Sequence, residues 1–231
     1  MVFSTPSVFT KWRVESIYSK EPCTLEWIGE FKTGEVLVDV GANVGMYSVW
    51  AAATRQAKVF AFEPEAQNYA LLNRNILLNN LRGRVMAYCM GLSDHQGLST
   101  LHIADLRAGG SCHSVDVALD YKHEPLQTFF EQGCIVSKLD DLVSSSTVPV
   151  PNHIKIDVDG FEPKVIAGAR EVLKNPAIRS LLIEINLNLA DHRAMIEELT
   201  GLGFKYDDKQ VQKAMRTDGP FKGVAEHVFK R

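Results

Sequence analysis

The chain has 231 residues, of which 45 % are hydrophobic and 23 % are charged, and its formal net charge at pH 7 is −3. This length and composition are typical of one globular domain and argue against a disordered or fibrous chain. The slightly acidic balance provides no global positive field, so we expect neither nucleic acid nor an anionic membrane surface as a partner.

Nothing at the start of the chain marks it for export. Residues 1–20 contain no apolar stretch long enough for a signal peptide or a membrane span. The four cysteines form no C-x-x-C pair, which favours reduced thiols over a disulfide framework or a zinc site. We therefore expect a cytoplasmic protein with no membrane span, and a homodimer is left open.

Short apolar runs alternate with helical patterns along most of the chain, which indicates βαβ units and a mainly parallel sheet. Residues 1–34 are expected to form an N-terminal extension, with a helix that packs on the domain or covers its site, and residues 35–231 are expected to form the domain itself. Strands are expected at 35–40, 57–62, 85–92, 98–104, 135–139, 153–157, 180–185, 204–207 and 224–229, and helices at 45–54, 65–80, 162–173 and 191–202.

Two segments depart from this alternation. Residues 105–133 are polar, aromatic and glycine-containing without a regular pattern. A loop of this length inside a compact domain is usually functional, so we expect a substrate loop or lid there. The last two expected strands, 204–207 and 224–229, have no helical pattern between them, which predicts an antiparallel pair at one edge of the sheet.

Parallel α/β sheets bind ligands at the carboxyl ends of their strands, so the residues just after each strand matter most. The first strand is followed by Asp39-Val40-Gly41-Ala42-Asn43-Val44-Gly45, where glycines permit a sharp turn and close approach of a ligand. Glu63 ends the second strand about 20 residues later, where an acid accepts the hydrogen bonds of a ribose diol. The G-x-x-x-G spacing lacks the third glycine of a dinucleotide loop, so Asp39 better suits the positive groups of S-adenosylmethionine.

Two further polar turns are expected at the same edge of the sheet. Ser93-Asp94 follows the third strand, where adenine would lie, although either residue also suits an ordinary turn. Asp157 and Asp159 share one face of the strand at 153–157 and should converge on the cleft. Carboxylates this close raise one another's pKa, which permits a general base or a metal site. The alternative for Asp159 and Glu162 is that they only cap the next helix.

These segments resemble the FkbM-type methyltransferases, which use S-adenosylmethionine and mostly methylate hydroxyl oxygens of sugars or natural products. The matching segments are 38–48, 62–64, 91–94, 138–142, 154–162 and 165–169. The resemblance implies a Rossmann-like class I methyltransferase, an α/β fold with a seven-stranded, mainly parallel sheet whose last strand is antiparallel and with helices on both faces. It assigns contacts to the methyl donor to Asp39, Gly41, Asn43, Gly45, Glu63, Ser93, Asp94 and Asp157, and the neighbouring Ala42, Tyr47, Ser48 and Pro64 are added as candidates.

Methyl transfer to a hydroxyl group requires a base, and the candidates are Asp157, Asp159 and the loop histidine His113. We expect a saccharide or small-molecule acceptor. No metal site is assigned, but Asp157, Asp159 and Glu184 leave Mg²⁺ as an alternative.

Two other functions stay open, a nicotinamide-dependent oxidoreductase on a similar fold and a non-catalytic cofactor-binding module. The remaining histidines are given structural interpretations, with His153 at a strand edge and His192 on a helix surface.

Overall fold

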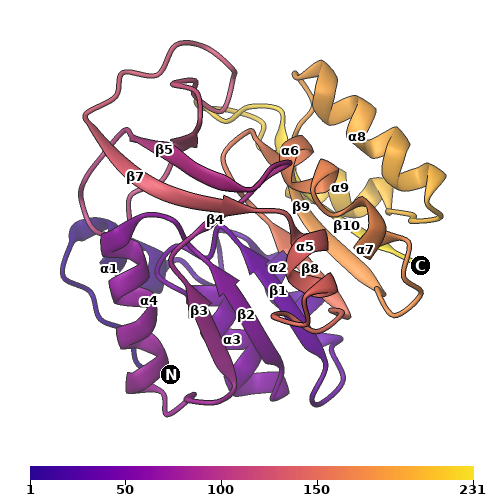
Figure 1. Ribbon diagram of the computed structural model, residues 1–231, viewed down its shortest axis with the longest axis horizontal. Helices are drawn as coiled ribbons and strands as arrows, with labels where there is room; N and C mark the ends of the chain where they lie inside the picture. The colour runs from indigo at the N-terminus through magenta and orange to yellow at the C-terminus, as the bar shows by residue number, and fades with distance from the viewer.

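Six strands form the main sheet of the structure, a computed structural model that describes residues 1–231 (Figure 1). Across the sheet they are β10 (Val224–Lys230), β9 (Ser180–Asn186), β8 (His153–Ile156), β1 (Val36–Val40), β2 (Lys58–Phe62) and β3 (Val85–Tyr88). All neighbours run parallel except β9 and β10. Nearly every residue of β1, β2, β8 and β9 is buried, as expected for parallel strands that are covered on both faces.

Helices cover both faces of this sheet and give the molecule three layers (Figure 1). One face packs against α5 (Leu139–Ser144), α6 (Glu162–Ala167), α7 (Arg170–Leu173) and α8 (Ala190–Gly201). The other packs against α2 (Pro22–Gly29), α3 (Met46–Arg55) and α4 (Ala66–Leu78). Apolar side chains on alternate positions of the strands supply the two cores, because successive residues of a strand point to opposite faces.

The N-terminal segment forms two helices, α1 (Val8–Glu15) and α2. A capping box starts α1, in which the Ser7 side chain accepts a hydrogen bond from the Thr10 amide at 3.1 Å. Trp27 and Ile28 of α2 are buried in the core on one face of the main sheet. The N-terminal segment is therefore packed into the domain through α2.

A second sheet interrupts the alternation. It contains β4 (Gly91–Leu92), β7 (Phe130–Ser137), β5 (Gly97–Ile103) and β6 (Ser114–Val115), in that order. Figure 1 shows β5 and β7 side by side outside the main sheet. The expected strand 85–92 is thus divided between two sheets, and the segment expected to be an irregular loop at 105–133 contains β6 and the start of β7.

The expectation of one seven-stranded sheet is wrong in its strand count, because the main sheet has six strands. Residues 204–207 make only an isolated antiparallel bridge, between Lys205 and Lys230, and β10 pairs with β9 instead. The expectation of no helix between residues 204–207 and 224–229 is also wrong. Asp207 caps α9 (Asp208–Ala214) by accepting a hydrogen bond from the Lys209 amide at 2.9 Å, so the chain enters a helix before a strand can form.

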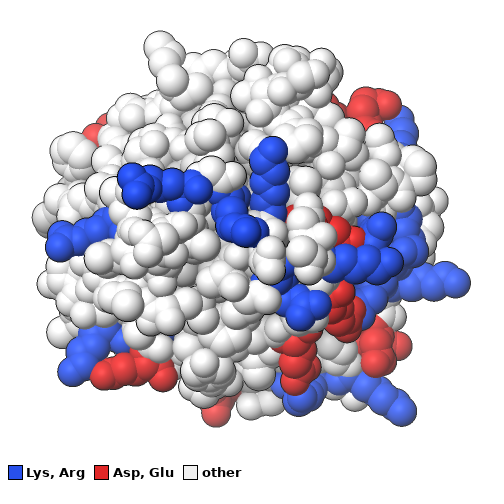
Figure 2. Space-filling model, turned by 90° about the horizontal axis from the view of Figure 1, so that it is seen from below, with Lys and Arg blue, Asp and Glu red and all other residues white.

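Figure 2 shows Lys and Arg side chains across the middle of one face, with most of the Asp and Glu side chains gathered among them toward one side, and most of that face is uncharged. Opposite charges pair at several exposed positions, including Lys230 with Glu30 at 2.6 Å and Lys213 with Glu26 at 3.6 Å. No helix in the chain has both the length and the apolar character that crossing a membrane requires.

Candidate functional site

A cavity of about 440 Å³ lies at the carboxyl ends of β1, β2 and β8. The turns after these strands contribute Gly41, Glu63 and Asp157 to its lining. The second sheet adds Leu101 and Val115. A smaller cavity of about 40 Å³ adjoins it, because Gly41, Asn43 and Asp157 line both. The turns that follow neighbouring parallel strands therefore meet in one site, as the sequence predicted.

The glycine turn after β1 is held against the adjacent turns by backbone contacts. Gly41 and Ala42 both donate amide hydrogen bonds to the Phe62 carbonyl at 3.0 Å. Gly41 has a φ of 77°, and a Cβ atom there would lie 1.9 Å from the Asp157 carbonyl oxygen. Gly45 has a different role, because a Cβ there would lie 2.3 Å from Leu72 of α4. Gly41 thus permits close approach at the site, whereas Gly45 permits helix packing and does not line the cavities.

Asp39 is a buried carboxylate with one oxygen unsatisfied. The Ser48 hydroxyl donates a hydrogen bond of 2.5 Å to Oδ2, and Oδ1 has no partner. Burial raises the pKa of Asp39 above its usual value. Asp39 lines the smaller cavity, together with Ala42 and Tyr47. A buried oxygen beside a cavity is available to a ligand that carries a hydrogen-bond donor.

Glu63 is also buried but lines the larger cavity. Its carboxylate accepts hydrogen bonds from the Asn43 amide at 2.8 Å and the Glu65 amide at 3.0 Å, one at each oxygen. Burial raises the pKa of Glu63 to about 7. Each oxygen retains a lone pair, so the side chain is both fixed in place and able to accept further hydrogen bonds. Pro64 also lines this cavity.

The structure separates the two candidates Ser93 and Asp94. Ser93 is buried and lines the larger cavity. Asp94 lines neither cavity and lies 2.9 Å from the His95 ring nitrogen, with its side chain 46 % exposed. The hydrogen bond with His95 lowers the pKa of Asp94. Only Ser93 of this pair is brought to the site.

Asp157 and Asp159 have opposite electrostatic environments. Burial opposes ionisation of Asp157, but Lys155, with its Nζ 2.9 Å away, and Lys20 outweigh it and lower the pKa of Asp157 to about 2. Burial, together with the charge on Asp157, raises the pKa of Asp159 to about 6. Asp159 accepts a hydrogen bond from the Cys112 amide at 2.8 Å and has a left-handed φ of 54°.

Glu162 holds the turn between β8 and α6. Its carboxylate accepts hydrogen bonds from the Val158 amide at 2.8 Å and the Gly160 amide at 3.1 Å, and the side chain is only 1 % exposed. Burial raises the pKa of Glu162 to about 8. These amides precede α6, and no side-chain hydrogen bond caps that helix, so Glu162 holds the turn and does not act as the helix cap of the capping alternative. Its side chain does not line the cavities.

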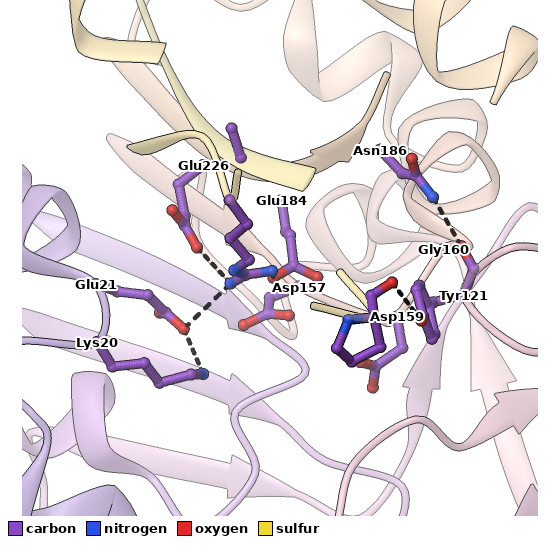
Figure 3. A network of polar contacts seen from close by, with 12 residues as sticks. Lys20, Glu21, Tyr121, Asp157, Asp159, Gly160, Glu184, Asn186 and Glu226 are labelled. Carbon is purple, nitrogen blue, oxygen red and sulfur yellow. Dashed lines mark hydrogen bonds and ion pairs between the residues drawn. The ribbon is translucent and has the colours of Figure 1, made fainter. Parts of the chain in front are cut away.

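Carboxylate oxygens of Asp157, Asp159 and Glu184 come within 4.8 Å of one another. Figure 3 shows Asp157 beside Glu184, with Asp159 nearby. Hard cations such as Mg²⁺ bind oxygen ligands of this kind. Glu184, however, is already paired with a positive side chain, because Arg216 Nη1 lies 2.7 Å from its carboxylate. Arg216 also lies 2.8 Å from Glu226. The geometry gives magnesium no support beyond the acidic cluster itself.

The remaining lining residues include several that sequence patterns did not identify. Arg216 and Phe221 come from the segment between α9 and β10, and Trp12, Arg13 and Lys20 come from the N-terminal segment. His113 also lines the larger cavity. Its Nδ1 accepts a hydrogen bond from the Ala104 amide at 3.3 Å, its buried Nε2 has no partner, and burial lowers its pKa.

The two histidines given structural interpretations lie deeper than expected. His192 is 1 % exposed, and its Nε2 lies 3.1 Å from the Gly160 carbonyl, so the expected helix-surface position is wrong. His153 begins β8 in the interior of the main sheet and is buried. Both positions are explained by polar partners that a hydrophobic pattern does not reveal.

Comparison with known proteins assigns the family. The FkbM methyltransferase domain matches residues 39–206, which is most of the chain. The chain belongs to the FkbM methyltransferase family. The FkbM-type resemblance seen in the sequence is therefore confirmed, and the protein is a methyltransferase.

Curated relatives of this FkbM-family methyltransferase act on different molecules. The hexuronic acid methyltransferase AglP of Haloferax volcanii is 28 % identical over 187 residues, 80 % of this chain and 70 % of the relative. The 31-O-demethyl-FK506 methyltransferase FkbM of Streptomyces tacrolimicus is 27 % identical over 188 residues, covering 71 % and 70 %. The family is thus shared by enzymes whose named substrates differ widely.

A solved structure supports the fold of this methyltransferase. The precorrin-6y C5,15-methyltransferase of Geobacter metallireducens superposes with a TM-score of 0.53 at 12 % identity, covering 99 % of this chain and 93 % of that chain. The likeness confirms a Rossmann-like methyltransferase fold for the α/β domain.

Proposed function

We propose that this methyltransferase transfers a methyl group from S-adenosylmethionine to a hydroxyl oxygen of a sugar or small metabolite. The observation that carries the proposal is the meeting of Gly41, Glu63 and Asp157 around one cavity at the carboxyl ends of adjacent parallel strands. The named substrates of the relatives, a hexuronic acid and 31-O-demethyl-FK506, favour a small-molecule acceptor. Family membership removes the reason for retaining the nicotinamide-dependent alternative.

The lining residues fit the parts of this donor. Glu63 has free lone pairs for a ribose diol, and Ser93 with Pro64 borders the space next to it for adenine. Asp157 is ionised, and Asp39 has an unsatisfied oxygen, which suits an ammonium group. Gly41 leaves room that a side chain would fill. When bound, S-adenosylmethionine supplies a methyl group activated by a positive sulfonium.

Asp159 is the carboxylate best suited to remove the acceptor's hydroxyl proton. It lines the larger cavity, and its pKa of about 6 allows it to be ionised at neutral pH yet basic enough to take a proton. Asp157, with a pKa of about 2, is a much weaker base. His113 is unsuited because Nδ1 accepts the Ala104 amide, which leaves the proton of the neutral ring on Nε2, where it is a donor and not a base.

The rest of the cavity suits a hydroxylated acceptor with some apolar surface. Trp12, Phe161 and Phe221 are aromatic lining residues, and residues 110–115 contribute the polar Ser111 and His113. Sugars present both hydroxyl groups and apolar ring faces, which such a lining accommodates. We therefore assign acceptor selection to residues 105–133 together with the N-terminal segment.

Calorimetric titration with S-adenosylhomocysteine tests the donor assignment. We expect Glu63→Ala to weaken binding by about 10- to 100-fold, because two hydrogen bonds from the ribose diol to the carboxyl group are lost. Glu131→Ala, at a side chain that is 66 % exposed on β7, is the matched control and should leave affinity unchanged. A wild-type protein that binds neither S-adenosylmethionine nor its demethylated product would overturn the proposal. Methyl transfer to a panel of hydroxylated sugars then tests the acceptor class.

A further inference from the structure

Hydrogen bonds to residues 108–109 and to α4 fix the N-terminal segment beside the proposed donor site. The Ser7 hydroxyl donates a hydrogen bond to the Ala108 carbonyl at 2.5 Å, and Arg13 Nε donates to the Gly109 carbonyl at 2.9 Å. The Ser4 amide donates to the Asn75 side chain on α4 at 2.8 Å. Arg13 is therefore held in place at the cavity and does not project freely into solvent.

The smaller cavity combines positive and negative side chains across a narrow space. Asp39 and Asp157 line it together with Arg13, Lys20 and Lys155. It adjoins the glycine turn, and Asp39 contributes the buried oxygen without a partner. A pocket with an unsatisfied carboxylate oxygen and adjacent cations is complementary to an amino-acid zwitterion, which carries an ammonium and a carboxylate on one carbon.

Arg13 is the cation in this pocket that lacks an acidic partner. Lys155 is paired with Asp157 at 2.9 Å, and Lys20 is paired with Glu21. Arg13 takes part in no ion pair, and its one side-chain hydrogen bond uses Nε. Both terminal nitrogens remain available, and a guanidinium binds a carboxylate through two parallel hydrogen bonds.

We infer that Arg13, assisted by Lys20, binds the α-carboxylate of the methionine part of the donor, while Asp39 and Asp157 bind its ammonium group. The inference rests on the proposed function, because it assumes that S-adenosylmethionine is the donor. It makes the N-terminal helix α1 part of the donor site and extends that site beyond the segments shared with the family, which begin at residue 39.

Arg13 also lines the larger cavity, so a carboxylate on the acceptor is the competing source of the same chemistry. Ligands that differ only in the amino-acid part of the donor distinguish the two sources. S-adenosylhomocysteine carries the carboxylate and the ammonium, decarboxylated S-adenosylhomocysteine retains only the ammonium, and 5′-methylthioadenosine has neither.

Titration calorimetry of these three ligands against Arg13→Gln, Lys20→Gln and the wild type tests the inference. We expect Arg13→Gln to weaken S-adenosylhomocysteine about 10- to 100-fold and Lys20→Gln to weaken it less. Both variants should bind decarboxylated S-adenosylhomocysteine and 5′-methylthioadenosine like the wild type, which also shows that the site is folded. Lys11→Gln removes a charge from α1 at a side chain that is 67 % exposed and should change nothing.

Equal weakening of all three ligands by Arg13→Gln, or no weakening of S-adenosylhomocysteine, would overturn the inference. Unchanged S-adenosylhomocysteine affinity with a raised KM for a uronic-acid acceptor would assign Arg13 to the acceptor instead. Failure of the wild type to bind any of the three ligands would instead refute the proposed function on which the inference depends.

Discussion

Two carboxylates separated by one residue are driven toward different protonation states in this site. Lysines hold Asp157 ionised, whereas burial and the charge on Asp157 make Asp159 reluctant to lose its proton. Asp159 also has a left-handed φ of 54°, a conformation that is uncommon outside glycine, asparagine and aspartate. Neighbouring acids whose environments separate their pKa values are a usual way to divide binding and proton-transfer roles.

Replacing Asp159 with asparagine should separate these roles. Asparagine tolerates the left-handed conformation and can still accept the Cys112 amide, so the fold should persist. We expect turnover to fall by about 10²- to 10⁴-fold, because the base is removed. Affinity for S-adenosylhomocysteine should stay within about twofold, well below the loss expected for a donor contact. Wild-type kcat/KM should rise with pH to about 6 and level off above it, because the base must be unprotonated.

Asp157→Asn is the comparison. It should weaken binding of S-adenosylhomocysteine, and it should move the rise of kcat/KM to lower pH, because the charge on Asp157 helps to raise the pKa of Asp159. A fully active Asp159→Asn enzyme with the wild-type pH profile would move the base elsewhere. The melting temperature gives an independent check, because removing a reluctantly ionised, buried carboxylate should not lower the melting temperature at pH 7.5.

The sequence indicates Gly41, Glu63 and Asp157 because they directly follow strands, where a parallel sheet presents its ligand site. It misplaces Asp94 because neighbours on a turn diverge, and His95 holds that carboxylate away from the cavity. It does not indicate Arg13, because a basic residue on a short helix has no distinguishing spacing. Only the three-dimensional contact with Gly109 brings Arg13 to the site.

At the scale of elements, local pattern predicts the strands of the main sheet but not all their pairings. β1, β2, β8 and β9 are continuous buried runs, which the hydrophobic pattern reveals. The second sheet is formed by β5 and β7, which are far apart in sequence, and no local signal specifies that they pair. Leu98 and Ile135 pair across these strands and are both exposed, so apolar residues here do not mark the buried face of a strand.

The turn after β1 depends on glycine for two reasons that can be measured separately. Gly41→Ala introduces both a left-handed alanine and a Cβ atom 1.9 Å from the Asp157 carbonyl oxygen. Gly34→Ala, just before β1, has a similar φ of 81° with open space around the new Cβ. We expect Gly34→Ala to lower the free energy of unfolding by about 1 kcal/mol and Gly41→Ala by about 3 kcal/mol or more.

Urea denaturation of both variants gives the comparison. The difference between them reports how tightly the turns after β1 and β8 are packed. Equal losses of unfolding free energy would mean that the turns after β1 and β8 can move apart at no energetic cost. The close approach of Gly41 to Asp157 would then not require glycine. Gly41→Ala should also abolish S-adenosylhomocysteine binding, which Gly34→Ala should leave intact.

At the scale of the whole molecule, the N-terminal segment connects both ends of the main sheet. Arg13 reaches the cavity at the carboxyl ends of the strands, while Trp27 of α2 donates a hydrogen bond of 2.7 Å to Ser180 at the opposite end. There His153 bridges Ser180 at 2.8 Å and Glu35 at 2.9 Å, and the Phe31 ring stacks on it at 3.7 Å. We therefore expect residues 1–34 to unfold together with the domain.

This buried cluster should make the stability of the molecule depend on pH. Burial lowers the pKa of His153 below its usual value, so the unfolded chain takes up a proton near pH 6.5 that the folded protein resists. The free energy of unfolding should therefore fall as pH drops below about 6.5, by up to about 1.4 kcal/mol per pH unit for this one group. His153→Gln should remove that part of the slope between pH 6.5 and 5, measured by urea denaturation at each pH, even though the variant is less stable at pH 8. Parallel curves for His153→Gln and the wild type would show that His153 is protonated equally in both states, and the cluster would then not couple pH to folding.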